Sequence, residues 1–169
     1  ANTLSLHDAF RSAPPLTSEL SNRQTCKNLL TTSSSGTAET VLTYSAYLAN
    51  AVAVFVAAGA SVMLSSPTPN NPWETGAFAY SPNRFTTYAS AVANSTGQVF
   101  IDHGQYTANR YKVLGATAVD VFLPNDHTHT SAVGAIEVAL AWVRGLLCGS
   151  GALRATVNVS SEVVPGSCI

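Results

Sequence analysis

The stretch AVAVFVAAGASVMLSS, residues 51–66, decides the fold class because its apolar pattern changes halfway along. Gly59 stands where a left-handed residue commonly ends a helix. The following SVMLSS, residues 61–66, is a short apolar run typical of a buried strand. The helix before it is predicted from apolar residues at helical spacing, namely Val41, Tyr44, Leu48, Val52 and Phe55. A helix, a glycine and a buried strand in this order make half of a βαβ unit.

The same unit recurs further along the chain. NRFTTYASAVANS (83–95) predicts a helix, QVFID (98–102) a second buried strand, and QYTANRYKVLG (105–115) another helix. A final helix, with Thr130 or Ser131 as its N-cap, carries one apolar stripe. That stripe is formed by Val133, Ile136, Leu140, Val143 and Leu147. Helices that alternate with short buried strands indicate an α/β fold with a parallel sheet.

The 169 residues indicate a single domain on length alone. We divide it into an irregular segment (1–36), α/β repeats (37–147) and a tail (148–169). Only two strands are convincing central strands, whereas such a sheet usually has about 5 or 6. The first strands are therefore missing from this chain, and we expect residues 1–169 alone not to form a stable fold.

The charge of the chain excludes two classes of partner. Charged residues make up 10% of the sequence, against about 25% in an average soluble domain, and the net charge is −1 without any basic run. Nucleic acid and anionic membranes both require clustered Lys and Arg. A membrane-spanning helix is also rejected, because Asn50, Gly59, Ser61 and Pro67 interrupt every apolar window of about 20 residues.

Several features favour an extracellular protein that meets sugars, although no secretory signal opens the sequence. Ser, Thr and Asn are abundant, and the sequons at Asn94 and Asn158 predict N-glycosylation. Of three cysteines, Cys148 and Cys168 bracket the polar tail and predict a disulfide. Cys26 is left as a buried free thiol or as the partner of a cysteine outside the chain.

The chemistry-bearing residues gather in FLPNDHTHTSAVGA, residues 122–135. With Asp126 three residues before His129, a tight turn lets the carboxylate approach the imidazole, fix its tautomer and stabilise its protonated form. A metal site built on Asp126, His127, His129 and His103 is the weaker interpretation, since an H-x-H pair alone is a weak signal. On spacing alone, a loop that merely caps the last helix and a catalytic pair remain alternatives.

The site is expected at one edge of the sheet. In open α/β sheets the ligand lies beyond the carboxyl ends of the strands. By that rule residues 67–76, 102–106 and 125–130 converge there.

NDHTHTSAVGA (125–135) resembles the closing catalytic block of the SGNH/GDSL hydrolases, in which Asp-x-x-His supplies acid and base. Within that superfamily the chain most resembles the fungal rhamnogalacturonan acetylesterase family, over roughly residues 37–169. The segments that carry this resemblance, in the same order, are ETVLTYSAYLANAV (39–52), LSSPTPNNPWETGAF (64–78) and VDVFLPNDHTHTSAVGA (119–135), and the paired C-terminal cysteines fit as well.

The resemblance implies a three-layer α/β/α, flavodoxin-like fold, secretion, N-glycosylation and removal of acetyl groups from acetylated pectic rhamnogalacturonan, with no metal and no cofactor. It makes His129 the general base and Asp126 the residue that orients it. Asn70, Asn71, Trp73 and Glu74 would border the substrate cleft, and the alternative for these four is a rigid proline-rich turn.

The sequence departs from the family by lacking the Gly-Asp-Ser block, the glycine block and the Gly-x-Asn-Asp block. It therefore resembles the C-terminal two-thirds of such an enzyme, with acid and base but without nucleophile or oxyanion donors. One hypothesis is a serine esterase whose nucleophile lies on an N-terminal segment or companion chain outside these residues. The alternative is a non-catalytic remnant or a carbohydrate-binding module of the same fold.

Overall fold

The computed structural model describes residues 29–32, 38–158 and 163–169. The chain forms two compact units. The first comprises Ala1–Val62 and Ala91–Gln98, and the second comprises Met63–Ser90 and Val99–Ile169. The presence of a single domain stays a prediction.

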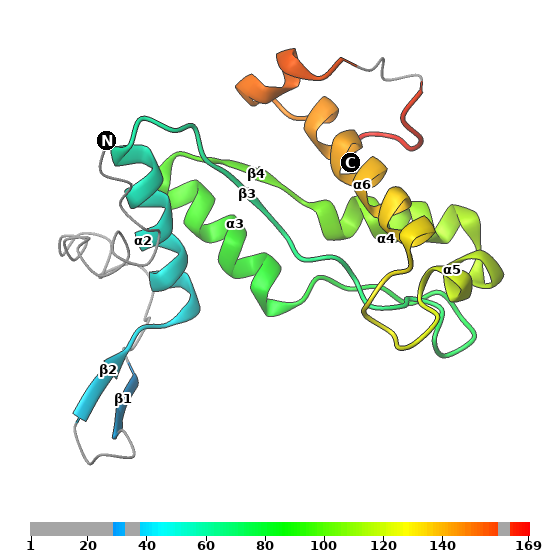
Figure 1. The fold of residues 1–169 in the computed structure, drawn as a ribbon, viewed down its shortest axis with the longest axis horizontal. Coiled ribbons are helices and arrows are strands. Elements are labelled where there is room, and N and C mark those ends of the chain that lie inside the picture. The colour runs from blue at the N-terminus through cyan, green and yellow to red at the C-terminus, as the bar shows by residue number, and fades with distance from the viewer. Residues whose placement is uncertain (1–28, 33–37, 159–162) are drawn as a thin grey trace. The chain divides into compact units, whose positions relative to one another are not determined.

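The first unit contains an antiparallel hairpin that the sequence did not predict (Figure 1). Strand β1 (Leu29–Thr32) pairs with β2 (Ala38–Val41), with Leu29 opposite Val41. The prediction that residues 1–36 are irregular is therefore wrong for β1. This strand is fixed by pairing with a later segment, and its own residues do not reveal that pairing. The rest of that predicted segment, and Cys26 with it, lies outside the described residues.

Helix α2 (Tyr44–Ala57) follows the hairpin. The Thr43 side chain accepts a hydrogen bond from the Ala46 N–H at 3.3 Å and starts the helix there, so Val41, predicted as helical, belongs to β2. Gly59, at φ +81°, lies just beyond the helix end as predicted. Within the described ranges, none of the helices combines the length and the apolar character needed to cross a membrane.

The second unit contains a parallel pair of strands. Strand β3 (Met63–Ser65) pairs with β4 (Val99–Ile101), with Met63 opposite Val99 and Ser65 opposite Ile101. Helix α3 (Arg84–Thr96) connects them and runs across the division between the units. Helices joined to parallel strands confirm the α/β class. Among the described residues β3 and β4 pair only with each other, and the three-layer arrangement stays a prediction.

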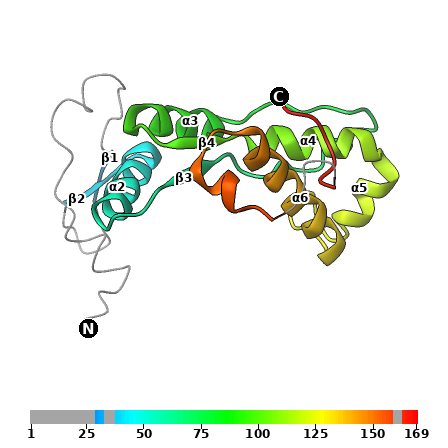
Figure 2. The ribbon, with the colours of Figure 1, turned by 90° about the horizontal axis from the view of Figure 1, so that it is seen from above.

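Three helices and a short 3₁₀ turn complete the second unit (Figure 2). They are α4 (His103–Leu114), α5 (Ala116–Phe122), α6 (Ala132–Cys148) and η1 (Ala152–Thr156). Helix α5 was not predicted, because it is only seven residues long and has too few turns to show a period. Tyr111, Val119, Phe122 and Leu123 form a buried cluster between α4, α5 and the loop that follows.

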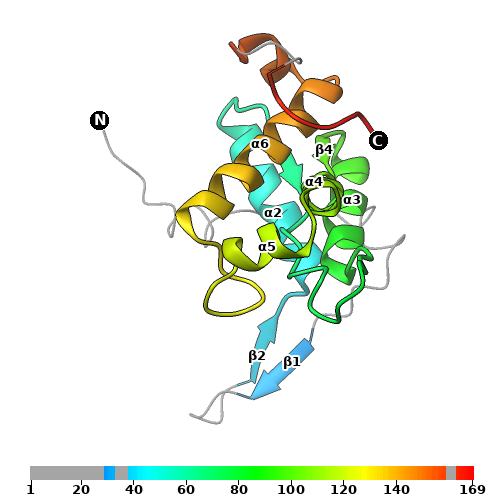
Figure 3. The same cartoon turned by 90° about the vertical axis from the view of Figure 1, so that its right-hand side faces the viewer.

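Helix α6 packs on α4 and α5, and Figure 3 shows these three helices from the side. Small residues of α6 take part in the packing. Its buried positions include Gly134, Ala141 and Gly145, and a β-carbon on Gly145 would lie 2.5 Å from Ile101 Cγ2. Only part of the predicted apolar stripe is covered, since Val133 and Ile136 are 56% and 61% exposed, whereas Leu140, Val143 and Leu147 are partly buried. The close approach of the helices, which needs glycine and alanine, decides the buried face.

The predicted disulfide between Cys148 and Cys168 is present, with the Cα atoms 5.5 Å apart. It closes a loop spanning a separation of 20 residues, for which chain entropy implies a contribution of about 3 kcal/mol. The tail is further held where the Arg144 Nε–H donates to the Pro165 carbonyl at 3.4 Å. The predicted glycosylation residues Asn94 and Asn158 are both exposed, and their modification stays a prediction.

Replacement of Gly134 by alanine is expected to lower the free energy of unfolding by about 1–3 kcal/mol. The added carbon would lie 2.7 Å from Phe122 Cβ and 2.9 Å from the Phe122 carbonyl oxygen, and a backbone oxygen cannot rotate away. Urea denaturation measures the change. Gly149→Ala is the matched control, since its added carbon meets nothing closer than 3.4 Å. Equal stability of the two variants would contradict this account.

Candidate active site

The candidate site is the loop between α5 and α6. Its two ends are tied together, because the Ser131 N–H donates to the Phe122 carbonyl at 2.7 Å and the Ser131 hydroxyl donates to the Val121 carbonyl at 3.2 Å. The same hydroxyl oxygen accepts from the Gly134 N–H at 3.3 Å and caps α6, so of the two predicted caps Ser131 is the one used. The two ends of the loop therefore meet next to the buried residue Phe122.

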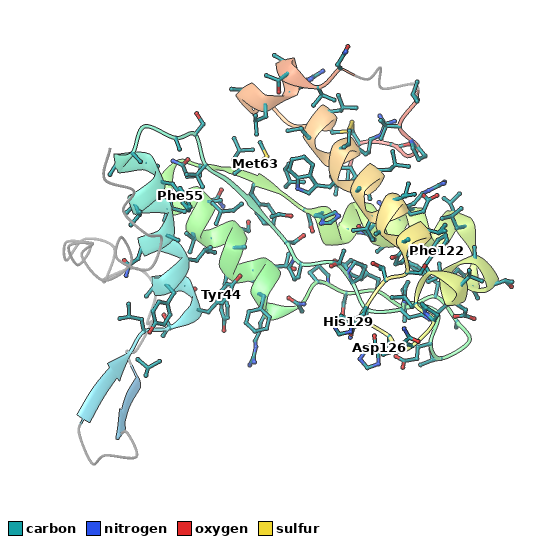
Figure 4. The ribbon with its side chains drawn as sticks, in the orientation of Figure 1. Tyr44, Phe55, Met63, Phe122, Asp126 and His129 are labelled. Carbon is teal, nitrogen blue, oxygen red and sulfur yellow. A yellow bond between two sulfur atoms is a disulfide. The ribbon has the colours of Figure 1, made fainter. Side chains whose placement is uncertain are left out.

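The Asp126 carboxylate organises this turn (Figure 4). Its Oδ1 accepts hydrogen bonds from the backbone N–H groups of Thr128 and His129, both at 2.7 Å. Its Oδ2 lies 2.7 Å from Nδ1 of the His129 ring. These hydrogen bonds hold the pKa of Asp126 well below its usual range. The bond from the backbone N–H of His129 has the largest effect, followed by the bond from its side chain and the bond from the backbone N–H of Thr128. The carboxylate thus stays ionised at neutral pH.

The contact with Asp126 fixes the role of each ring nitrogen in His129. A carboxylate can only accept, so in the neutral ring Nδ1 carries the proton and donates it. The other nitrogen, Nε2, then has a free lone pair, and the side chain is 83% exposed. One oriented nitrogen and one open nitrogen are what a general base needs when it activates a hydroxyl nucleophile.

The proline-rich loop after β3 braces the turn, mainly through Asn71. The Asn71 backbone N–H donates to the His127 carbonyl at 2.8 Å, and its side-chain amide donates to Asp120 Oδ1 at 3.0 Å. Its Oδ1 accepts from the Trp73 N–H at 2.9 Å. The Trp73 indole N–H in turn donates to the Tyr111 carbonyl at 3.0 Å, which anchors the loop to the buried cluster.

Two further contacts join the same segments. Asn70 Oδ1 accepts from the Thr128 hydroxyl at 3.1 Å, and Glu74 Oε1 lies 3.4 Å from His127 Nδ1. The ring of His127 therefore turns toward Glu74 and away from Asp126. All four residues predicted to border the cleft thus lie against the turn or brace it, although Trp73 contributes to the core.

The third predicted segment, residues 102–106, adjoins the loop after β3. Asp102 Oδ1 accepts from the Ser66 hydroxyl at 2.8 Å and from the Gln105 N–H at 3.3 Å, and Ser66 Oγ accepts from the Gly104 N–H at 2.8 Å. A β-carbon on Gly104 would lie 2.7 Å from the Pro67 carbonyl oxygen, so glycine permits this approach. Sequence reasoning therefore brought the right segments together.

His103, named in the metal interpretation, has a structural role. Its Nε2 lies 2.9 Å from the Val138 carbonyl oxygen, and burial lowers its pKa. In the described part of the chain no group of three or more His, Cys, Asp or Glu side chains is placed to hold a metal ion. The absence of a metal requirement stays a prediction.

Comparison with known proteins agrees with the resemblance stated above. No family model matches the chain. A rhamnogalacturonan acetylesterase from Emericella nidulans is 49% identical over 131 residues, which cover 78% of this chain and 52% of that protein. This similarity supports the SGNH hydrolase family for the chain. It spans about half the length of the relative that it matches.

Sequence reasoning missed several residues around the site. The Asp120 carboxylate accepts a hydrogen bond from the Asn71 side-chain amide, 49 positions away in the sequence. The Thr128 hydroxyl donates to Asn70, 58 positions away. Tyr80 lies near Asp102, and its pKa is raised, first by burial and then by that carboxylate. Such long-range contacts leave no periodic signal in the sequence, although Asp120 within the matching segment 119–135 was a hint.

Replacement of Asp126 by asparagine is expected to change the tautomer of neutral His129. An asparagine has one accepting oxygen, and its amide N–H₂ would face Nδ1, which favours the tautomer protonated on Nε2. Imidazole ¹⁵N chemical shifts distinguish the two forms. Asp120→Asn makes the same chemical change away from His129 and should leave the Nδ1–H tautomer in place. An unchanged tautomer in Asp126→Asn would contradict the assigned geometry.

The lowered pKa of Asp126 predicts how the turn responds to acid. A depressed carboxyl pKa contributes stability that is present above the ordinary value of about 3.9 and is lost as pH falls through the folded value. The hydrogen bonds to Thr128 and His129 should therefore survive at pH 3.9. A ¹³C titration of the Asp126 carboxyl checks this, and a midpoint at the ordinary value would show that the three hydrogen bonds do not hold in solution.

Proposed function

We propose that this protein is a secreted carbohydrate esterase that removes acetyl groups from pectic rhamnogalacturonan by serine-hydrolase chemistry. The observation that carries the proposal is the Asp126–His129 pair, at 2.7 Å, in a chain 49% identical over 131 residues to a rhamnogalacturonan acetylesterase. The same aspartate–histidine geometry serves hydrolases on unrelated folds, because a hydroxyl nucleophile needs a base that is itself oriented.

His129 acts as base and then as acid in the proposed reaction. Its Nε2 removes the proton of a serine hydroxyl while the serine oxygen attacks the acetyl carbonyl carbon. The protonated ring then gives that proton to the sugar oxygen as the ester C–O bond breaks, which leaves an acetyl-serine. A water molecule, deprotonated by the same nitrogen, attacks next and releases acetate and the serine. Asp126 stabilises the imidazolium formed in each step.

The serine is the part of this proposal that lies outside the 169 residues. No serine of the sequence stands in a Gly-Asp-Ser context. We therefore assign the nucleophile and the oxyanion donors to an N-terminal segment or a companion chain. Intact-mass analysis and N-terminal sequencing of the natural protein distinguish this from a non-catalytic carbohydrate-binding module, which would consist of these residues without a serine-bearing segment.

Secretion is supported by the chemistry of the chain. Disulfides such as Cys148–Cys168 persist in oxidising compartments. The exposed Asn94 and Asn158 lie in sequons, which serve as glycosylation acceptors in secreted proteins. An acetylated pectic polysaccharide is likewise an extracellular substrate, so the location and the proposed activity agree.

The two histidines of the turn are expected to behave differently when removed. In the enzyme supplied with its serine-bearing segment, His129→Ala should lower acetate release from acetylated pectin by about 10²–10⁴-fold, because general acid–base catalysis is lost. His127→Ala, the matched control two residues away in the same turn, removes only an exposed contact with Glu74 and should stay within a few-fold of the parent. A chelator should leave both rates unchanged.

Three outcomes would contradict the roles assigned here. Loss of activity in His127→Ala but not in His129→Ala would exchange the two residues. Inactivation by a chelator would favour a metal hydrolase. Ester hydrolysis by residues 1–169 alone would mean that a serine within them is the nucleophile.

A further inference from the structure

A hollow of about 270 Å³ lies beside the catalytic turn, between residues 67–72 and 79–86 of the second unit. The two segments are joined by a hydrogen bond from the Ala79 N–H to the Pro72 carbonyl at 2.8 Å. Pockets for drug-sized ligands measure about 300–1,000 Å³, so this volume suits one small ring. The predicted cleft residues divide here: Asn70 and Asn71 line the hollow, whereas Trp73 and Glu74 do not.

The wall of the hollow carries no charged side chain. It is formed by three prolines and by the polar side chains of Asn70, Asn71, Tyr80, Asn83 and Thr86, among others. Burial and the nearby Asp102 raise the pKa of Tyr80, so its phenol is neutral at neutral pH. Amides and hydroxyls pair with sugar hydroxyls, while proline and tyrosine rings cover apolar C–H faces. A carboxylate in the same space would lose its hydration without gaining a counter-charge.

Two amide groups offer donors to a ligand. Asn83 Oδ1 accepts from the N–H groups of Phe85 and Thr86, at 2.9 and 3.1 Å, and so caps α3. Asn70 Oδ1 accepts from the Thr128 hydroxyl. In each side chain the amide oxygen thus accepts a hydrogen bond from the protein, and within the described residues neither Nδ2 group has a hydrogen-bond partner. Because Asn70 also contacts Thr128, a ring bound here lies beside the loop that holds Asp126 and His129.

We propose that this hollow is a subsite for an uncharged sugar ring of the polysaccharide and that it discriminates against a uronate ring. The inference rests on the proposed function, which supplies a polysaccharide substrate. It goes beyond that function by assigning Asn83, Tyr80 and Asn70 to substrate selection and by stating the charge of the ring that enters.

The decisive variant is Asn83→Asp in the enzyme supplied with its serine-bearing segment. Aspartate keeps an oxygen for the α3 cap, removes the amide donor and adds a negative charge to the hollow. We expect KM for the acetylated polymer to rise about 5–10-fold, the effect of one lost hydrogen bond, with kcat for p-nitrophenyl acetate within two-fold of the parent. Asn83→Ser keeps the cap without the charge and should show the same rise in KM.

The matched control is Asn109→Asp, which makes the same chemical change on the exposed surface of α4. The Asn109 side chain accepts from the Gln105 amide at 2.9 Å, a bond that aspartate retains. Its KM and kcat should equal those of the parent. Thermal unfolding of all three variants verifies that the fold is intact.

A direct binding test does not depend on activity. Methyl galactoside and methyl galacturonoside differ only by a hydroxymethyl group or a carboxylate, and NMR titration of the parent and Asn83→Asp compares them. We expect the neutral glycoside to shift the amide signals of residues 67–72 and 79–86 and to bind at least five-fold more tightly than the uronate. Equal or tighter binding of the uronate, or unchanged KM and binding in Asn83→Asp, would overturn the subsite. A parent that binds the neutral glycoside but hydrolyses no ester would instead overturn the proposed function.

Discussion

The three hydrogen bonds accepted by the Asp126 carboxylate are the interaction on which the site depends. Two of them, from the backbone N–H groups of Thr128 and His129, fold the chain back over the aspartate, and the third orients the His129 ring. Structure and chemistry are therefore fixed by the same two oxygens. A free carboxylate would have to be desolvated and ordered at each turnover, whereas this one is already held in place.

The turn keeps this geometry because two close approaches hold it from opposite sides. Gly134 lets the start of α6 reach the backbone of Phe122, which closes the loop at its base. Asn71 ties the proline-rich loop to the His127 carbonyl and to Asp120. Prolines at 67, 69 and 72 restrict the backbone of that brace, which reduces the entropy lost on ordering it. The site is thus a surface loop that is held in place by backbone contacts and hydrogen bonds on both sides.

Local patterns predicted the alternation of helices with buried strands, an N-cap at Thr130 or Ser131 and the disulfide between Cys148 and Cys168, because each depends on neighbouring residues or on a well-spaced pair. Segment convergence followed from the edge rule for parallel sheets. What failed depended on distant partners. Strand β1 exists by pairing with β2, and the α6 stripe at Val133 and Ile136 is exposed because glycine contacts decide the packed face. Hydrophobicity alone does not encode how closely two backbones approach.

The charges near the site give a reason for the hollow beside it to bind an uncharged sugar ring. Residues 67–76 and 123–131 contain the carboxylates Glu74 and Asp126 and no Lys or Arg. Negative charge favours the imidazolium that His129 would become in the proposed reaction, but it repels an anionic sugar placed nearby. For unit charges about 4 Å apart the repulsion is about 1 kcal/mol in water and about 4 kcal/mol near a protein surface. In the proposed enzyme a neutral ring in the hollow would avoid this repulsion, so the charge that favours the imidazolium would also account for the proposed selectivity of the hollow.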